Sequence, residues 1–357
     1  MMHLKSYTKK ELQEFISSGD FKKYDFLPIT EHRGNSQIVN PKASETDVLL
    51  TLAFVGEKLA GYLGTLPDEF KTNDETIKFA WLSTLYVSEH FRGKRIAQKL
   101  LDSVFEQYNN FIAITEFTKE AESLYNKVGK FSYIDAKLGK RFYLQSDLKT
   151  ILPTKKPKTK SLSPFLKVTD LVTNQMVRTK NILVKKPKFR FEIQKDTDTE
   201  ILEFLNKFSS HRSGEEIAWF INNPWILEQN STEANYLFSS YSSTFAYHWI
   251  KMKNESNEVE SVALLQEREG HLKIPYVFSK TNLEKISEVV SYYSKKKKIK
   301  FITSYQTELN PLLSKKLTKL FSKNFERRYM FSKELKQKMG PNFDPKFQDG
   351  DGDCALT

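Results

Sequence analysis

The sequence predicts a mixed α/β fold (an α+β mixed sheet) built twice along the chain. Short β-like runs alternate with amphipathic helices from Leu4 to Leu148. The same order returns in outline from Phe189 onward, after a segment of different composition. A length of 357 residues is enough for two hydrophobic cores of ordinary size. We therefore expect two domains.

The first half opens with a helix and a hairpin. Thr8 to Ser17 (TKKELQEFIS) is typical of a helix with Thr8 as its N-cap. Two β-rich runs, Asp47 to Val55 and Lys58 to Leu66, are joined by the tight turn Gly56-Glu57, which indicates a hairpin. Thr76 to Val87 is predicted to be a third strand.

A helix over Arg95 to Tyr108 is predicted next. Its apolar residues recur at helical spacing on one face, at Ala97, Leu100, Leu101, Val104, Phe105 and Tyr108. The strand Asn110 to Phe117 and the helix Lys119 to Val128 should follow, with Gly129 ending that helix. Phe131 to Leu144 reads as a closing hairpin.

The second half repeats this order after a linker. Residues 151–188 carry prolines among lysines, threonines and serines, with one weak helix near Phe165 to Gln175. Near the end, RRYMFSKELK (Arg327 to Lys336) matches KRFYLQSDLK (Lys140 to Lys149) in residue type at most positions, which indicates a weak internal duplication. We predict domains at 1–150 and 189–340, a partly ordered linker at 151–188 and an acidic tail at 341–357.

Composition limits the classes of partner and the cellular compartment that we expect for this protein. The charge of +12 would attract polyanions, but the excess lysines are spread along the chain, so nucleic acid is not an expected partner. The longest apolar runs are of strand length, so no membrane span is expected. The N-terminus lacks an apolar signal region, and the single Cys354 fits a reducing compartment. We expect a cytoplasmic protein.

The stretch VSEHFRGKRIAQKLL, from Val87 to Leu101, carries the chemistry. Here a strand stops at a turn with three cations and restarts as a helix. The first amides of a helix have no partner within it, and together with the helix dipole they attract phosphate. Gly93 lets the backbone come close to a ligand, while Arg92, Lys94 and Arg95 add positive charge. The turn is therefore a candidate pyrophosphate site.

At these residues the sequence resembles the GNAT superfamily of N-acetyltransferases, which bind acetyl-CoA through Q/R-x-x-G-x-G/A after the fourth strand. Arg92 and Ala97 fill the outer positions of this signature, and Gly93, Lys94 and Ile96 match its frequent form. Arg95 departs from it, because the family has glycine at that position. If arginine cannot adopt the backbone angle of that glycine, the loop is altered and CoA binding weakened.

Two further motifs support the resemblance over the first 150 residues. AESLYNKVGKF, from Ala121 to Phe131, is similar to the family's A-x-x-LY-x-K-x-GF with Lys130 inserted, and it implies that Tyr125 protonates the departing CoA thiolate. WLSTLYV, from Trp81 to Val87, resembles the family's fourth strand. The resemblance implies that backbone groups of Leu85, Tyr86 and Val87 hold the pantetheine arm and polarise the thioester. It also implies two tandem GNAT-like domains of the acyl-CoA N-acyltransferase fold, the second degenerate.

Acetyl transfer to an amine also needs a group that removes the amine proton. Glu116, at the end of a strand, is the leading candidate, and a solvated strand-end carboxylate is the alternative. The acceptor, a small-molecule amine or a peptide, should meet residues before and within the first hairpin. Candidates there are Glu31, His32, Arg33, Asn40 and Asp68, each of which also suits a turn or a cap.

Three functions remain open at this point. The first is an N-acetyltransferase that uses acetyl-CoA without a metal. The second is a tandem-GNAT aminoacyl or acyl transferase of the Fem type, which would need no intact CoA site. The third is a nonenzymatic module that binds acyl-CoA or nucleic acid. The tail DGDGDCALT, from Asp349, spaces carboxylates like the start of a calcium loop but lacks the loop's glycine and final glutamate, so we expect no metal.

Overall fold

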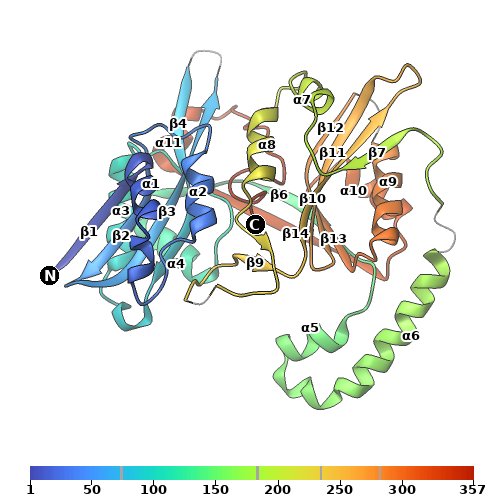
Figure 1. The fold of residues 1–357 in the computed structure, drawn as a ribbon, viewed down its shortest axis with the longest axis horizontal. Coiled ribbons are helices and arrows are strands. Elements are labelled where there is room, and N and C mark those ends of the chain that lie inside the picture. The colour runs from blue at the N-terminus through green and yellow to red at the C-terminus, as the bar shows by residue number, and fades with distance from the viewer. Residues whose placement is uncertain (73–74, 182–184, 234, 281–282) are drawn as a thin grey trace. The chain divides into compact units, whose positions relative to one another are not determined.

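The computed structural model describes residues 1–72, 75–181, 185–233, 235–280 and 283–357. The chain forms two compact units, and neither is continuous in sequence (Figure 1). Unit 1 comprises Met1–Ala136, Ser209–Ser242 and Arg327–Thr357. Unit 2 comprises Lys137–Phe208 and Ser243–Glu326.

Unit 1 contains most of the elements of the first half, together with segments from the rest of the chain. Its strands are β1 (Met2–Thr8), β2 (Val48–Val55), β3 (Lys58–Lys71), β4 (Thr76–Val87), β5 (Ile112–Ile114), β8 (Leu227–Glu228) and β9 (Tyr241–Ser242). Its helices are α1 (Lys9–Ser17), α2 (Glu31–Ile38), α3 (Ile96–Gln107), α4 (Lys119–Val128), α8 (Gly214–Asn222) and α11 (Lys333–Met339), with 3₁₀ turns η1 (Asp20–Lys23) and η2 (Glu89–Phe91).

Unit 2 contains the linker helices and the elements of the second half. Its strands are β7 (Phe191–Gln194), β10 (Phe245–Lys253), β11 (Val259–Arg268), β12 (His271–Ser279) and β13 (Phe301–Ser304). Its helices are α5 (Leu148–Lys155), α6 (Ser163–Asn181), α7 (Thr199–Leu205), α9 (Glu284–Lys296) and α10 (Leu309–Lys316), with the 3₁₀ turn η3 (Pro157–Leu162). Two strands, β6 (Phe131–Tyr143) and β14 (Phe321–Ser332), begin in one unit and end in the other.

The two sheets have the same strand order and the same directions. In unit 1 the order is β1-β2-β3-β4-β5-β14, and in unit 2 it is β7-β10-β11-β12-β13-β6. Neighbours are antiparallel except β4 with β5 and β12 with β13, which are parallel. This agreement confirms the internal duplication. The last strand of each half is exchanged, because β14 completes the first sheet and β6 the second.

Helices cover both faces of the unit 1 sheet. Alternate residues of β2 and β3 point to opposite faces. On one face Leu50, Leu52 and Tyr62 pack with α1. On the other, Ala53 and Leu63 pack with α3 and α4. In unit 2, α9 and α10 supply one core with β10 to β13.

The predicted mixed α/β fold class is confirmed, and most elements of the first half lie where we expected them. Thr8 caps α1 in a capping box with Glu11, and β4 and α4 have the predicted bounds. The strand predicted at Asn110 to Phe117 is shorter, since β5 spans only Ile112–Ile114. The strand β1 and the helix α2 were not predicted.

One predicted element was wrong in kind, and a second is a helix as predicted but with other bounds. Phe131 to Leu144 is one strand, β6, and not a hairpin. A Cβ atom at Gly139 would lie 2.5 Å from the ring of Tyr305, so this glycine makes room for that ring within a continuous strand. The weak linker helix is α6, which is longer than expected and is preceded by α5.

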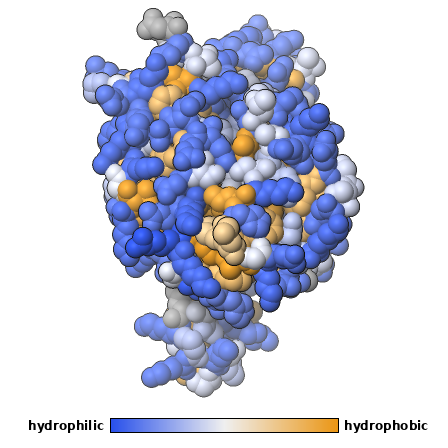
Figure 2. Space-filling model, turned by 90° about the vertical axis from the view of Figure 1, so that its left-hand side faces the viewer, coloured by the Kyte–Doolittle hydropathy of each residue, from blue (hydrophilic) through white to orange (hydrophobic). Residues whose placement is uncertain are grey.

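Figure 2 shows one face of the molecule, where hydrophilic residues predominate and hydrophobic ones gather in a few patches, the largest near the middle of the view. None of the helices in the described residues is both long enough and apolar enough to cross a bilayer.

Candidate active site

The predicted phosphate site is an exposed turn between β4 and α3. Arg92, Lys94 and Arg95 are exposed, and Gly93 has a left-handed φ of 81°. A Cβ atom at Gly93 would meet no atom within 4 Å, so open space lies above the backbone there. Arg92 contacts Glu89 at 3.1 Å in an exposed ion pair that water weakens.

Helix α3 begins with free amides at this turn. Arg95 occupies its N-cap position with φ 57° and ψ 23°, the left-handed conformation in which glycine is usual. The departure from the family signature therefore leaves the backbone angle in place. Within the described residues, no acceptor is bonded to the amides of Ile96 or Ala97. Ile96 itself is buried in the core, which fixes the start of the helix.

Strand β4 has an open edge that leads to this turn. It pairs with β3 along its whole length, up to Gly61↔Val87. On its other side β4 pairs with β5 only at Ala80 and Trp81. From Leu82 to Val87, therefore, no described strand pairs with that edge, and Leu85, Tyr86 and Val87 are half-buried. An extended polar chain can add to such an edge as a further strand would.

The exposed turn and the open edge are continuous, and together they fit the donor that the sequence analysis expected. Free amides at a helix start, a glycine under open space and three cations suit a diphosphate. The open edge of β4 suits the amide groups of a pantetheine arm. In the described part of the chain, no group of three or more His, Cys, Asp or Glu side chains is placed to hold a metal ion.

Tyr125 lies on α4 in the core on the same side as α3. It is 4% exposed, and its ring packs against Phe117 and Phe131, with centroids 6.2 and 5.3 Å away. Burial, assisted by the carboxylate of Asp353, raises the pKa of the Tyr125 hydroxyl well above its usual range. Tyr125 therefore keeps its proton at neutral pH.

Glu116 follows β5 by two residues, as the sequence indicated. Its side chain is 57% exposed, and its Oε1 lies 3.1 Å from Nη2 of Arg327. Arg327 is 6% exposed and also contacts Asp349 at 2.5 Å. The guanidinium thus holds two carboxylates, and one oxygen of Glu116 is occupied by it.

An aromatic cluster covers the face of β4 opposite to α3. Tyr86 contacts Tyr62 and Phe26, with ring centroids 5.7 and 5.2 Å apart. Tyr62 is fully buried, and within the described residues its hydroxyl has no hydrogen-bond partner. Next to this cluster, Arg33 donates to the hydroxyl of Tyr236 at 3.2 Å.

The acceptor candidates are distributed over unit 1 in different roles. Arg33 is buried, with its guanidinium 3.6 Å from the ring centroid of Trp225. Asn40 is buried and donates to the carbonyl of Pro67. His32 contacts the carbonyl of Trp225 at 3.0 Å, and burial lowers its pKa. Glu31 is exposed and paired with Lys22. Of these, Arg33 alone adjoins the aromatic cluster.

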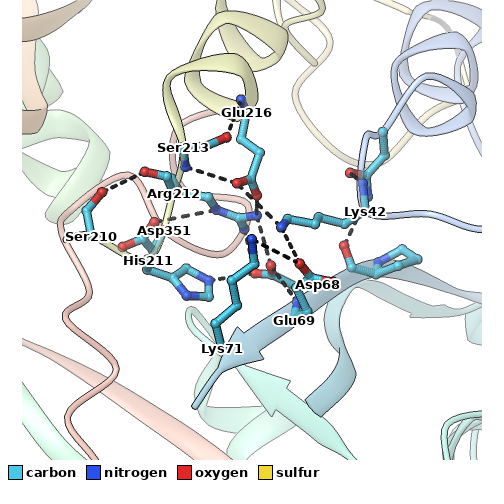
Figure 3. A network of polar contacts seen from close by, with 12 residues as sticks. Lys42, Asp68, Glu69, Lys71, Ser210, His211, Arg212, Ser213, Glu216 and Asp351 are labelled. Atoms are coloured by element: carbon cyan, nitrogen blue, oxygen red, sulfur yellow. Dashed lines mark hydrogen bonds and ion pairs between the residues drawn. The ribbon is translucent and has the colours of Figure 1, made fainter. Parts of the chain in front are cut away.

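Asp68 belongs to a buried polar network (Figure 3). Both of its oxygens contact the guanidinium of Arg212, at 3.0 and 2.7 Å, and His211 and Trp81 bond to it at 2.9 and 2.7 Å. Burial alone would raise the pKa of Asp68, but Arg212 and His211 outweigh it and hold the pKa well below its usual range. Arg212 also contacts Glu216 of α8 at 3.0 Å.

The acidic tail is part of unit 1. Asp351 lies 3.5 Å from Nε of Arg212, and Asp349 pairs with Arg327. Both aspartates are buried, as are Cys354, Ala355 and Leu356. The carbonyl of Leu356 accepts from the amide of Trp225 at 3.0 Å. The tail is therefore a packed segment whose acidic residues face buried arginines.

Sequence reasoning missed the partners of this tail. Ser213 and Glu216 form a capping box at the start of α8, a signal that the segment SSHRSGEE carries. It would have placed Arg212 at a helix start. Nothing in the local sequence, however, relates Arg212 to Asp68 or to Asp351, which lie 144 residues before it and 139 residues after it.

Comparison with known proteins relates the first part of the chain to one family. Residues 13–129 match the model of the acetyltransferase (GNAT) family. No curated protein matches the chain at the sequence level.

Several solved structures share the fold across both units. A conserved protein of unknown function from Enterococcus faecalis, described as a probable N-acyltransferase, aligns over 94% of this chain and 73% of its own, with 10% identity and a TM-score of 0.51. A GCN5-related N-acetyltransferase from Anabaena variabilis aligns over 93% and 72%, with 12% identity and a TM-score of 0.51. N-myristoyltransferase from Saccharomyces cerevisiae with bound myristoyl-CoA aligns over 93% and 79%, with 11% identity and a TM-score of 0.50.

Proposed function

Because residues 13–129 form a GNAT-family acetyltransferase domain, we propose that the protein is an N-acetyltransferase. It transfers an acetyl group from acetyl-CoA to a primary amine of a small molecule or a peptide. The observation that carries this proposal is the open edge of β4, which runs directly into the cationic start of α3.

The donor is bound by backbone and cations together. The pyrophosphate meets the amides of Ile96 and Ala97 above Gly93, and the side chains of Arg92, Lys94 and Arg95 neutralise it. The pantetheine arm lies along Leu85, Tyr86 and Val87. Acetyl-CoA supplies the acyl group, and one amide of this strand polarises its carbonyl.

The transfer itself needs two proton movements. The amine nitrogen forms a bond to the acyl carbon and loses a proton, while the bond from that carbon to sulfur breaks. Tyr125 donates its hydroxyl proton to the sulfur, and its raised pKa means that the hydroxyl carries this proton at neutral pH. Glu116 is the base that its position at the end of β5 suggests, acting through the oxygen that does not contact Arg327.

A second function has one observation in its favour. Tyr125 is 4% exposed and enclosed by aromatic rings, as a purely structural tyrosine would be. In that case the domain binds acyl-CoA without catalysis. A longer acyl group on the donor is compatible with the same turn, because the phosphate contacts do not depend on the acyl chain.

Two measurements test the proposal. Thermal unfolding with CoA should show a rise in Tm, because a ligand of the native state stabilises it. Release of free thiol from acetyl-CoA should depend on an added primary amine, measured over a panel of polyamines, amino sugars and lysine peptides. A rise in Tm without thiol release would favour the binding module, and no rise in Tm would contradict both functions.

A further inference from the structure

We infer that Asp353, in the acidic tail, accepts the amine proton in the reaction proposed above. The inference rests on the proposed function and assigns the role of base to Asp353 in place of Glu116, the candidate given there. It starts from the position of the tail. Gly352 approaches β5 so closely that a Cβ atom there would lie 2.3 Å from Cγ2 of Thr115. The hydroxyl of Thr115 then donates to Oδ1 of Asp353 at 3.2 Å.

The register of the sheet places this contact beside the start of the open edge of β4. Ala113 is the last residue of β5 that pairs with β4. Thr115 comes two residues later, so Asp353 lies where β4 and β5 diverge. The open edge of β4 begins at the same level, at Leu82. A thioester bound along that edge would end near this point, because the edge begins where β4 and β5 part.

The groups that face Asp353 come from three elements. Arg33 of α2 and Glu116 after β5 act electrostatically on the carboxyl group of Asp353. Alongside burial, the charge of Asp353 in turn raises the pKa of Tyr125 on α4. Asp353 is half-buried. Burial raises the pKa of its carboxyl to about 6, while Arg33 and the Thr115 hydroxyl lower it and Glu116 raises it. A group with this pKa is ionised at pH 7 and can still take a proton.

Buried ion pairs hold the tail in this place. Asp349 is fixed by Arg327, and Asp351 by Arg212, which Asp68 in turn binds through two oxygens. Asp353, the third member of the DGDGD motif, is the one without an arginine ion pair in the described structure. Asp349 and Asp351 therefore position the tail, and Asp353 is the one whose carboxylate can accept the amine proton.

The step is balanced without a further reactant. The amine nitrogen bonds to the acyl carbon, and its proton passes to the carboxylate of Asp353. The bond from carbon to sulfur breaks, and the sulfur takes the proton of Tyr125. Water then returns a proton to Tyr125 and removes the one on Asp353.

The test is the pH profile of kcat for amine-dependent thiol release by the full chain. The wild type should lose activity as pH falls through about 6, because the base becomes protonated. Asp353→Asn should lower kcat by about 100-fold and abolish this acid limb, while Asp353→Glu restores part of the rate. Asp344→Asn, at an exposed carboxylate earlier in the same tail, is the matched control and should keep both the rate and the limb.

A second variant leaves Asp353 unchanged and alters its hydrogen-bond partner. Thr115→Val removes the hydroxyl that stabilises the charged carboxylate but keeps the side-chain shape, so the acid limb should move to higher pH. This result is informative even if Asp353→Asn does not fold. Activity and an acid limb that survive in Asp353→Asn, or a limb that Glu116→Gln removes, overturn the inference alone. A wild type that raises its Tm with CoA but releases no thiol with any amine overturns the proposed function and this inference with it.

Discussion

The two units have the same sheet order, yet their strand–helix crossovers differ at each feature that a CoA ligand would need. In unit 1, the pairing of β4 with β5 ends at Trp81. Strand β4 then continues to half-buried residues, which are followed by a cationic turn. In unit 2, β12 leaves β13 after Lys273 but continues through Ile274, Tyr276 and Phe278, which are buried. After the point where the parallel strands separate, the end of β4 is therefore partly exposed, whereas alternate residues of β12 are buried.

The chemistry of the second crossover also opposes a phosphate. Pro275 has no amide hydrogen to offer a ligand, and the side chain of Gln306 donates to the carbonyl of Ile274 at 3.5 Å. Helix α9 begins with Glu284, whereas α3 has no acidic residue in its first turn. A carboxylate at a helix start occupies the position that an anionic ligand would take. Among the described residues, the backbone, exposure and charge of the proposed CoA site therefore occur together in unit 1 and not at the corresponding place in unit 2.

The largest expected effect concerns Tyr125, since α10, in the corresponding place in unit 2, contains no tyrosine. Tyr125→Phe should lower kcat by about 100-fold, because general acid catalysis is lost while the ring remains packed. The Kd for CoA should stay within about threefold, since the hydroxyl acts on the leaving group. Steady-state kinetics and calorimetry check these values. A loss of similar size in both would remove the proton donor role.

The second prediction reverses charge at each crossover in turn. Arg92→Glu and Lys94→Glu should each weaken CoA binding by about tenfold at low salt, because a charge-assisted contact to phosphate becomes a repulsion. Added salt should reduce the difference. The control is Lys280→Glu, an exposed cation just before α9. If it weakened CoA binding equally, the effect would be one of net charge and not of a site.

A third prediction places an acidic residue in the first turn of α3, as α9 has in Glu284. Ala97→Glu should weaken CoA binding about fivefold, yet raise the unfolding free energy by about 0.3–0.5 kcal/mol, since a carboxylate is favourable at a helix start. Glu284→Ala should not create CoA binding, because Pro275 and the buried strand remain. Binding and stability that fell together in Ala97→Glu would indicate damage to the helix.

These contrasts show how far the sequence alone can lead. The turn from Arg92 to Ala97 could be found because adjacent residues supply all of its charge, glycine and amides. The same holds for α4, where Lys119–Val128 has a cap, an apolar face and a terminal glycine. Local pattern determines such elements.

The remaining features depend on residues far apart in sequence. The exchange of β6 and β14 between sheets is not visible in either strand, because both have ordinary strand composition. The tail shows the same limit. Its carboxylates indicate a flexible acidic end or one docked on basic residues, and only the fold brings Asp351 to Arg212 and Asp353 to Thr115. Buried ion pairs of this kind are set by tertiary packing.

The smallest effect concerns the one departure from the family signature. Arg95 holds a left-handed backbone angle, which costs a residue with a Cβ atom about 1 kcal/mol relative to glycine. Arg95→Gly should therefore raise the unfolding free energy by about 0.5 kcal/mol after the entropy of the glycine is subtracted, and should change the Kd for CoA by less than about threefold. Lys298→Gly is the matched control, because Lys298 has φ 55° just after α9 and lies in unit 2, for which we propose no CoA site. It should give the same stabilisation and no change in binding. If Arg95→Gly instead weakened binding by tenfold or more, the guanidinium would be a phosphate ligand that compensates for the strain of its own backbone.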